Sequence, residues 1–165
     1  MLTRKYADIR VDQKLTLGQR ATLVRLSSTG VEVVQPIEAS RVLTATTAVL
    51  ASENGTTFFL NAATEFVTTL PLPALNLRYT FIVSAAPSGA SYTVVTAASA
   101  NIIKGLQQSV AGDAGDFGTA DDTITFVDGQ SLAGDRVDVI SDGTSWFAYA
   151  NSKVAAGITF TQATA

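Results

Sequence analysis

Short runs of alternating apolar and polar residues follow one another along most of the chain, separated by turn-forming residues. In the run covering residues 78–84, alternation places Tyr79, Phe81 and Val83 on one face of a strand that we expect to lie centrally in the core. Further runs predict strands at residues 42–50, 56–60, 66–70, 91–96, 101–103, 123–127, 136–141 and 144–150. Short strands rich in threonine and valine are typical of an all-β, antiparallel β-sandwich or barrel, jelly-roll-like in its make-up. Residues 104–110 are the one weak candidate for a helix.

The last two of these runs are joined by Asp142-Gly143, which predicts a hairpin. An Asp-Gly pair suits a tight two-residue turn, because both positions tolerate a positive φ. Alternation points Val137 and Val139 inward on the first strand. Whether Trp146 lies opposite this apolar row or opposite the charged row depends on the register of the hairpin, which the sequence leaves open.

The first part of the chain differs from the strand-rich remainder. Residues 21–26 and 31–34 are β-prone and flank a polar loop, so they predict a short hairpin. Pro36 lacks an amide donor and interrupts any ladder that continues past it. We therefore expect an extended N-terminal arm over residues 1–40 and a β-sandwich or barrel body over residues 41–165.

The arm and the body carry opposite net charge. Residues 1–41 hold seven basic and four acidic side chains, a net charge of +3, whereas the remainder holds four basic and ten acidic ones, a net charge of −6. A basic segment on an acidic protein favours contact with an acidic partner, although its charges can also simply be solvated. The candidate binding residues of the arm are Arg4, Lys5, Arg10, Lys14, Arg20 and Arg25.

Nucleic acid is not the expected partner of the arm. Asp8 and Asp12 are interleaved with its first basic residues, and only Tyr6 offers a ring for stacking on a base. We expect the arm to dock on an acidic protein surface instead.

Composition excludes several kinds of chemistry. The 165 residues include no histidine and no cysteine, which rules out Ser-His and Cys-His hydrolase mechanisms, His-ligated zinc and disulfides. Apolar residues make up 47% and charged residues 15%, which argues against disorder and predicts an apolar surface that self-associates. We expect no enzymatic activity and no cofactor. The apolar runs are too short to span a bilayer, so we expect a soluble product with no membrane partner.

Two groups of acidic residues are the remaining candidates for chemistry. The glycine-rich loop at residues 112–122 carries four carboxylates and could bind calcium, but its spacing fits no known calcium loop, so we interpret it as solvated. Asp121 with Asp122, or Asp135 with Asp138, could form a glycosidase pair, although nothing in the sequence marks a sugar cleft between them.

Two aromatic residues of the closing hairpin are candidates for a different kind of contact. Trp146 and Tyr149 could stack on a carbohydrate, but we interpret them as core or subunit-interface aromatics.

Three sequence segments of the strand-rich region occur in a fixed order along the chain, and this order is a more specific feature than any one segment alone. Residues 57–83 contain Phe-Phe-Leu and Arg-Tyr-Thr-Phe-Ile-Val; residues 91–96 and 101–105 form the second segment; Ser-Asp-Gly-Thr-Ser-Trp at 141–146 is the third. This order, over about residues 44–160, resembles virion proteins of tailed bacteriophages. It is most similar to capsid decoration proteins, also called cement or head-stabilising proteins.

The resemblance implies a small β-rich protein, usually a homotrimer, on the outer surface of an icosahedral capsid. It would be made in the host cytoplasm and would clamp neighbouring subunits of the major capsid protein. Similar β-modules occur in phage fibres and spikes, so a receptor- or glycan-binding domain of a tail fibre or spike is the alternative. The first 40 residues fall outside the resemblance.

Overall fold

The computed structural model describes residues 23–27, 30–34, 39–109, 114–115 and 120–162. The chain divides into two units, Met1–Ile37 and Glu38–Ala165. In the first unit, β1 (Leu23–Ser27) and β2 (Gly30–Val34) pair antiparallel, as expected for a hairpin there. Their ladder includes Ser27 opposite Gly30, so the two strands extend further into the predicted loop than the sequence indicated.

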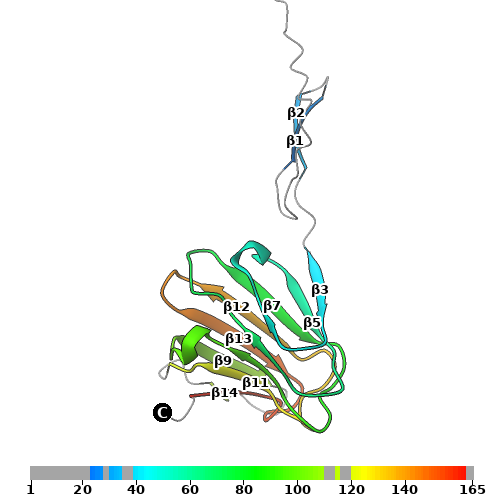
Figure 1. The fold of residues 1–165 in the computed structure, drawn as a ribbon, viewed down its shortest axis with the longest axis vertical. Helices are drawn as coiled ribbons and strands as arrows, with labels where there is room; N and C mark the ends of the chain where they lie inside the picture. Colours follow the sequence, from blue (N-terminus) through cyan, green and yellow to red (C-terminus); the bar gives the residue numbers. More distant parts are fainter. Residues whose placement is uncertain (1–22, 28–29, 35–38, 110–113, 116–119, 163–165) are drawn as a thin grey trace, which may run out of the picture. The chain divides into compact units, whose positions relative to one another are not determined.

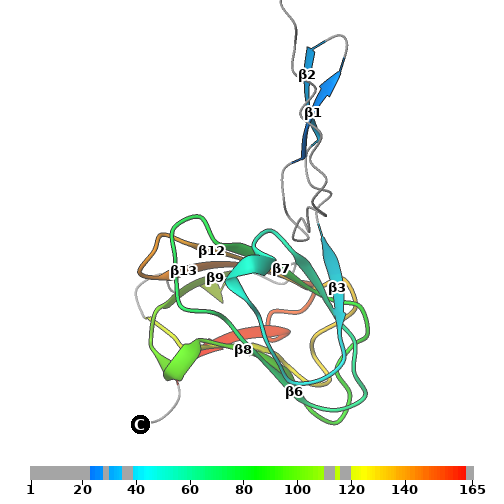
Figure 2. The same cartoon turned by 45° about the horizontal axis from the view of Figure 1, so that its top comes forward.

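The second unit, the body, is a sandwich of two β-sheets (Figures 1 and 2). Within the described residues, one sheet has seven strands in the order β10-β9-β13-β12-β7-β5-β3 and the other has five in the order β14-β11-β8-β6-β4. Figure 2 separates the two layers, with β7, β12 and β13 in one and β6 and β8 in the other. The strands are β3 (Ser40–Leu43), β4 (Thr47–Ala48), β5 (Thr57–Leu60), β6 (Phe66–Thr69), β7 (Arg78–Val83), β8 (Tyr92–Val95), β9 (Ile103–Ser109), β10 (Ala114–Gly115), β11 (Thr123–Phe126), β12 (Arg136–Ser141), β13 (Trp146–Ser152) and β14 (Ile158–Thr161). The all-β prediction is confirmed.

The first part of the body is a series of strands that wind from one sheet to the other and back. From β3 to β8, successive strands alternate between the two sheets. Each strand therefore returns to its own sheet in the same direction, so β3, β5 and β7 pair parallel, as do β4, β6 and β8. The crossover that every parallel pair requires is here a strand of the opposite sheet.

The prediction of purely antiparallel, jelly-roll-like sheets is wrong for this part of the body. Alternation of apolar residues has a period of two in both kinds of ladder, so it reports a half-buried strand and not the direction of its neighbour. The later strands are mainly antiparallel: β12 pairs with β7 and β13, and β11 pairs with β8 and β14.

The predicted helix at residues 104–110 is a strand. β9 pairs parallel with β13 along its full length, and Ile103, Gly105 and Gln107 face inward. Pairing and burial outweigh the helical preference of these residues, as is common for weak local propensities. Helices within the described residues are limited to two short 3-10 turns, η1 (Ala51–Glu53) and η2 (Ala97–Ser99).

Three further predictions need correction. The strand expected at 42–50 is two short strands in different sheets, β3 and β4, because the chain crosses the sandwich after Leu43. The strand expected at 101–103 contributes only Ile103, which opens β9. β14 was not predicted at all, since its four residues follow a glycine-containing turn and are only partly apolar.

The turn of the closing hairpin has four residues, not two. The ladder between β12 and β13 ends with Ser141 opposite Trp146. Gly143 alone in this turn has a positive φ, of 99°. The Asp142 carboxylate accepts hydrogen bonds from the backbone N–H groups of Thr144 and Ser145, each at 2.8 Å. These bonds stabilise the longer turn and explain why an Asp-Gly pair did not give the tight form.

The core lies between the two sheets and is rich in aromatic side chains. In β7, the expected inward residues Tyr79, Phe81 and Val83 are all buried. Phe58 stacks on Phe81, with ring centroids 5.4 Å apart. The largest fully buried side chains are Trp146, Tyr79, Tyr92, Phe58, Phe66, Phe81 and Phe126. Burial of such side chains from both sheets is the main stabilisation of the sandwich.

Candidate functional site

The outer face of the seven-stranded sheet carries an unusual mixture of charged and apolar side chains. The ladder registers set Thr57, Thr80, Asp138 and Tyr149 side by side across β5, β7, β12 and β13. A neighbouring row holds Arg78, Ile140, Phe147 and Lys104. Ile140 and Tyr149 are 45% and 44% exposed, so this sheet face is not a polar, solvated surface throughout.

A groove of about 590 Å³ runs over β7, β12 and β13. Its solvent-facing walls include Arg78, Thr80, Arg136, Asp138, Ile140 and Tyr149. This volume lies within the range of small-molecule sites. The groove is therefore a candidate binding site on this face.

Asp138 is the polar centre of the groove. Its Oδ1 atom accepts hydrogen bonds from Thr80 Oγ1 at 2.6 Å and from Arg136 Nη2 at 2.7 Å. The bond to Asp138 raises the pKa of the Arg136 guanidinium above its ordinary value. Among the described residues, no hydrogen bond to the other oxygen, Oδ2, is found.

Arg78 stands at one end of the groove with its guanidinium open to solvent. Its backbone N–H donates to Asn54 Oδ1 at 2.8 Å, whereas its side chain makes no ion pair with any residue in the described part of the chain. At the far end of the same row, the Lys104 ammonium lies 5.3 Å from the centre of the Phe147 ring. Three of the four basic residues beyond position 41 thus share one sheet face.

A second candidate surface is an apolar end of the sandwich, made by the loops before β5 and β7. These loops follow β4 and β6, which pair parallel, and the Val49 N–H donates to the Thr69 carbonyl at 2.9 Å, so both loops leave the same end of the five-stranded sheet. Leu50, Leu72 and Leu75 are 59%, 74% and 70% exposed. The backbone of Leu75 lies 3.5 Å from the place where a Cβ on Gly143 would stand, so the turn of the closing hairpin borders this surface. We refer to Leu50, Leu72 and Leu75 as the apolar end.

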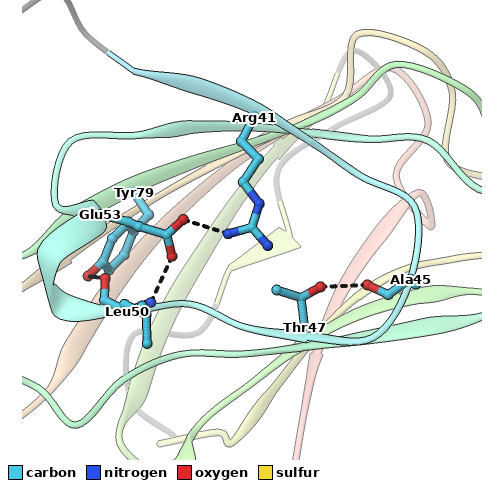
Figure 3. Close-up of polar contacts among 6 residues, drawn as sticks. All are labelled: Arg41, Ala45, Thr47, Leu50, Glu53 and Tyr79. Carbon is cyan, nitrogen blue, oxygen red and sulfur yellow. Dashed lines mark hydrogen bonds and ion pairs between the residues drawn. The ribbon is translucent and has the colours of Figure 1, made fainter. Parts of the chain in front are cut away.

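The loop that carries Leu50 is held in place by polar contacts (Figure 3). Glu53 joins Arg41 of the edge strand at 2.6 Å and accepts a hydrogen bond from the Leu50 backbone N–H at 2.9 Å. The Tyr79 hydroxyl donates to the Leu50 carbonyl at 3.1 Å. Leu50 is thereby fixed at the surface, and Arg41 places a charge on an edge strand, which discourages uncontrolled strand pairing.

The predicted binding residues of the arm are not brought into any described site. Arg4, Lys5, Arg10, Lys14 and Arg20 lie outside the described residues. Arg25 lies in β1, where its ladder partner is Glu32.

The acidic candidates are separated by the fold. Asp135 is buried and accepts hydrogen bonds from Ser131 Oγ and from the backbone N–H groups of Leu132 and Lys153. Asp138 lies on the outer face of β12, so these two carboxylates have different partners and do not form a pair.

Part of the acidic loop is more ordered than the solvated loop that we expected. Asp121 and Asp122 are buried, and Asp121 exchanges backbone hydrogen bonds with Ile103. Within the described residues no group of three or more acidic side chains is placed to hold a metal ion. The calcium alternative depends also on Asp113 and Asp116, which lie outside the described residues.

The two hairpin aromatics have different environments. Trp146 is fully buried and packs 5.8 Å from Tyr79 between ring centroids, so it is a core residue. Tyr149 faces outward into the groove. The sequence prediction treated the two aromatics alike, and only the ladder register shows that Tyr149 stands beside Asp138.

Comparison with known proteins adds no relative. A scan against protein-family models matches no family, and a search of the curated proteins finds no match to this chain. No helix in the described part of the chain is long and apolar enough to cross a membrane.

Proposed function

We propose that this chain is a structural virion protein that decorates and stabilises the outside of an icosahedral phage capsid, binding the major capsid protein as a homotrimer. The observation that carries this role is the apolar end, where three leucine side chains are each more than half exposed. Exposed aliphatic side chains gathered in one place are typical of an interface. The sequence of strand segments over about residues 44–160, whose order resembles that of decoration proteins, supports the same role.

The proposed mechanism is mechanical and involves no catalysis or cofactor. A protein that binds only the assembled shell stabilises the shell by mass action. Three linked copies raise the effective concentration of each contact, so individually weak contacts suffice. The apolar end supplies the contact between copies, and the basic arm, with Arg4, Lys5, Arg10, Lys14, Arg20 and Arg25, ties the trimer to the capsid.

The oligomeric state tests the role of the apolar end. We expect the native protein to have the mass of a trimer by light scattering, and the double variant Leu72→Ser/Leu75→Ser to dissociate towards monomer while keeping the circular dichroism spectrum of the folded body. Ile140→Ser, which changes a half-exposed residue elsewhere, is the matched control and should remain trimeric. A wild-type monomer at all concentrations would contradict the trimeric role.

Capsid binding tests the decoration role and the contribution of the basic arm to it. The purified protein should co-sediment with expanded phage capsids that lack it. Replacing Arg4, Lys5, Arg10 and Lys14 by glutamine should abolish co-sedimentation and leave the circular dichroism spectrum unchanged, because the substitutions lie outside the body. Failure of the wild-type protein to sediment with capsids would remove the decoration role.

The alternative, a receptor- or glycan-binding domain of a tail fibre or spike, is favoured by one observation, the groove over β7, β12 and β13. Protein that binds saccharides but not capsids would favour this alternative.

A further inference from the structure

The groove on the seven-stranded sheet contains polar groups with unused bonding capacity, and an apolar surface lies beside them. Arg78 offers a guanidinium without an ion-pair partner among the described residues. Asp138 offers Oδ2, to which the described residues donate no hydrogen bond. Ile140 and the Tyr149 ring are each nearly half exposed. We propose that this groove binds a saccharide that carries a carboxylate, with Arg78 on the carboxylate, Asp138 on a hydroxyl group and Tyr149 against the sugar ring.

The charges of the groove select this chemistry. A guanidinium binds a carboxylate through two parallel hydrogen bonds, so Arg78 favours a ligand with one carboxylate. Asp138 accepts hydrogen bonds only, so its open oxygen requires a donor such as a hydroxyl group. Saccharides that contain a uronic or sialic acid present both groups on one small molecule.

The charges of the groove also argue against polyanions. Arg136 is joined to Asp138 at 2.7 Å, so these two charges largely cancel, and Arg78 is left as the one unbalanced charge in the described lining of the groove. A nucleic acid or a run of acidic residues would bring several negative charges along the groove, of which Arg78 could balance only one. A ligand with a single carboxylate at the Arg78 end matches this charge.

The dimensions of the groove suit a short oligosaccharide. Arg78 is opposite Ile140 in the ladder, and Arg136 is four residues away on the same strand as Ile140. At roughly 3.4 Å per residue, the two arginines therefore stand about 14 Å apart along the strands. Tyr149 and Thr80 lie between them, beside Asp138. The apolar face of a sugar ring can rest on Tyr149 while its hydroxyl groups reach Asp138.

This site goes beyond the proposed structural role and does not depend on it. The groove lies on the outer face of the sheet, whereas the apolar end is formed by loops. A virion protein can hold a saccharide on one surface and a capsid on another. Either inference can fail alone, because one is measured with saccharides and the other with capsids.

Calorimetric titration of the full-length protein tests the site. The probes are a hyaluronan tetrasaccharide and sialyllactose, with carboxyl-reduced hyaluronan tetrasaccharide and lactose as their neutral counterparts. We expect at least one carboxylated probe to bind about tenfold or more tightly than its neutral counterpart. The probe that binds identifies the acid as uronic or sialic. Absence of binding by both carboxylated probes at about 10 mM would overturn the inference.

Variants link binding to the groove. Arg78→Gln should weaken binding of the carboxylated probe about tenfold or more and leave the Tm unchanged. Arg41→Gln, an exposed arginine outside the groove, is the matched control and should bind as the wild type does. Tyr149→Leu should weaken binding, and Tyr149→Phe should preserve it, since the ring alone supplies the stacking surface. Equal losses in Arg78→Gln and Arg41→Gln, or hexaglutamate binding as tightly as the saccharides, would overturn the site.

Discussion

The two sheets of the body are alike on the inside and different on the outside. Among the described strand positions, the outer face of the five-stranded sheet carries no charge and is mainly threonine and valine. Its outward residues in the paired strands are Ala48, Val67, Thr69, Thr93, Val95, Thr123, Thr125, Thr159 and Thr161. The seven-stranded sheet instead presents Arg78, Arg136, Lys104 and Asp138 together with Ile140 and Tyr149.

This difference separates two kinds of information in the sequence. Inward positions of both sheets are apolar because they bury the same core. Threonine and valine suit an outward strand position by their β-branched shape alone, so the five-stranded face is explained by folding. Arginine, aspartate and tyrosine on the other face contribute little to the core, so their presence is better explained by a binding role.

The largest expected effect tests whether the two inner faces form a single core. Trp146→Ala from the seven-stranded sheet and Phe126→Ala from the five-stranded sheet should each lower the free energy of unfolding by about 3–5 kcal/mol, since both side chains are fully buried. Urea denaturation followed by circular dichroism measures both, with Thr125→Val as a surface control that changes stability by less than about 0.5 kcal/mol. Two separate unfolding transitions, or a small effect in one variant only, would contradict a shared core.

A smaller effect is expected where β9 of one sheet packs against Phe160 of the other. A Cβ on Gly105 of β9 would stand 2.4 Å from the Phe160 ring of β14. Gly105→Ala should therefore cost about 1–3 kcal/mol of unfolding free energy by overpacking. Adding Phe160→Leu should recover part of the loss, because it removes the ring atoms that clash. If Gly105→Ala is as stable as the wild type, the two sheets are not packed together at this point.

The same inward positions explain which part of the fold was predictable. The inward residues of β7 and β12 were predicted correctly from the sequence, because every second residue of these strands is buried without a break in the pattern. β9 was missed because its inward positions include Gly105 and Gln107, which do not read as an apolar row. A glycine suits the inward position 105 because the Phe160 ring occupies the space that a Cβ would need, and the sequence does not show a contact between residues that are 55 positions apart.

The groove was less predictable than the core. Alternation placed Thr80 and Asp138 at outward strand positions but did not do so for Tyr149, and the grouping of these residues depends on ladder register and strand order. Tyr149 comes beside Asp138 only through the pairing of β13 with β12, and Thr80 joins them only because β7 is the other neighbour of β12. Neither pairing follows from the local sequence, since several strand orders bury the same apolar residues.

A matched pair of threonine substitutions sharpens the contrast between the outer faces. Thr80 Oγ1 donates to Asp138 at 2.6 Å, so Thr80→Val should cost about 0.5–1.5 kcal/mol of unfolding free energy. Thr93 occupies an outward position on β8, and its hydroxyl group makes no hydrogen bond with any of the described residues. Thr93→Val should therefore be close to neutral. Equal effects of the two substitutions in thermal unfolding would mean that the bond to Asp138 is not maintained in solution.

The smallest expected effect concerns the response of the closing hairpin to acid. Hydrogen bonds from the Ser145 and Thr144 backbone N–H groups and from the Thr144 hydroxyl hold the pKa of Asp142 below its ordinary value. A depressed pKa in the folded state means that these bonds contribute stability above the ordinary pKa of the carboxyl group. That contribution is lost as the pH falls through the lowered value.

Carboxyl NMR titration measures this pKa directly. Thr144→Ala should raise the pKa of Asp142 towards its ordinary value, because the hydroxyl donor at 2.9 Å is removed. Thr159→Ala, on the uncharged five-stranded face, should leave it unchanged. An ordinary Asp142 pKa in the wild-type protein would show that the turn is not closed around the carboxylate.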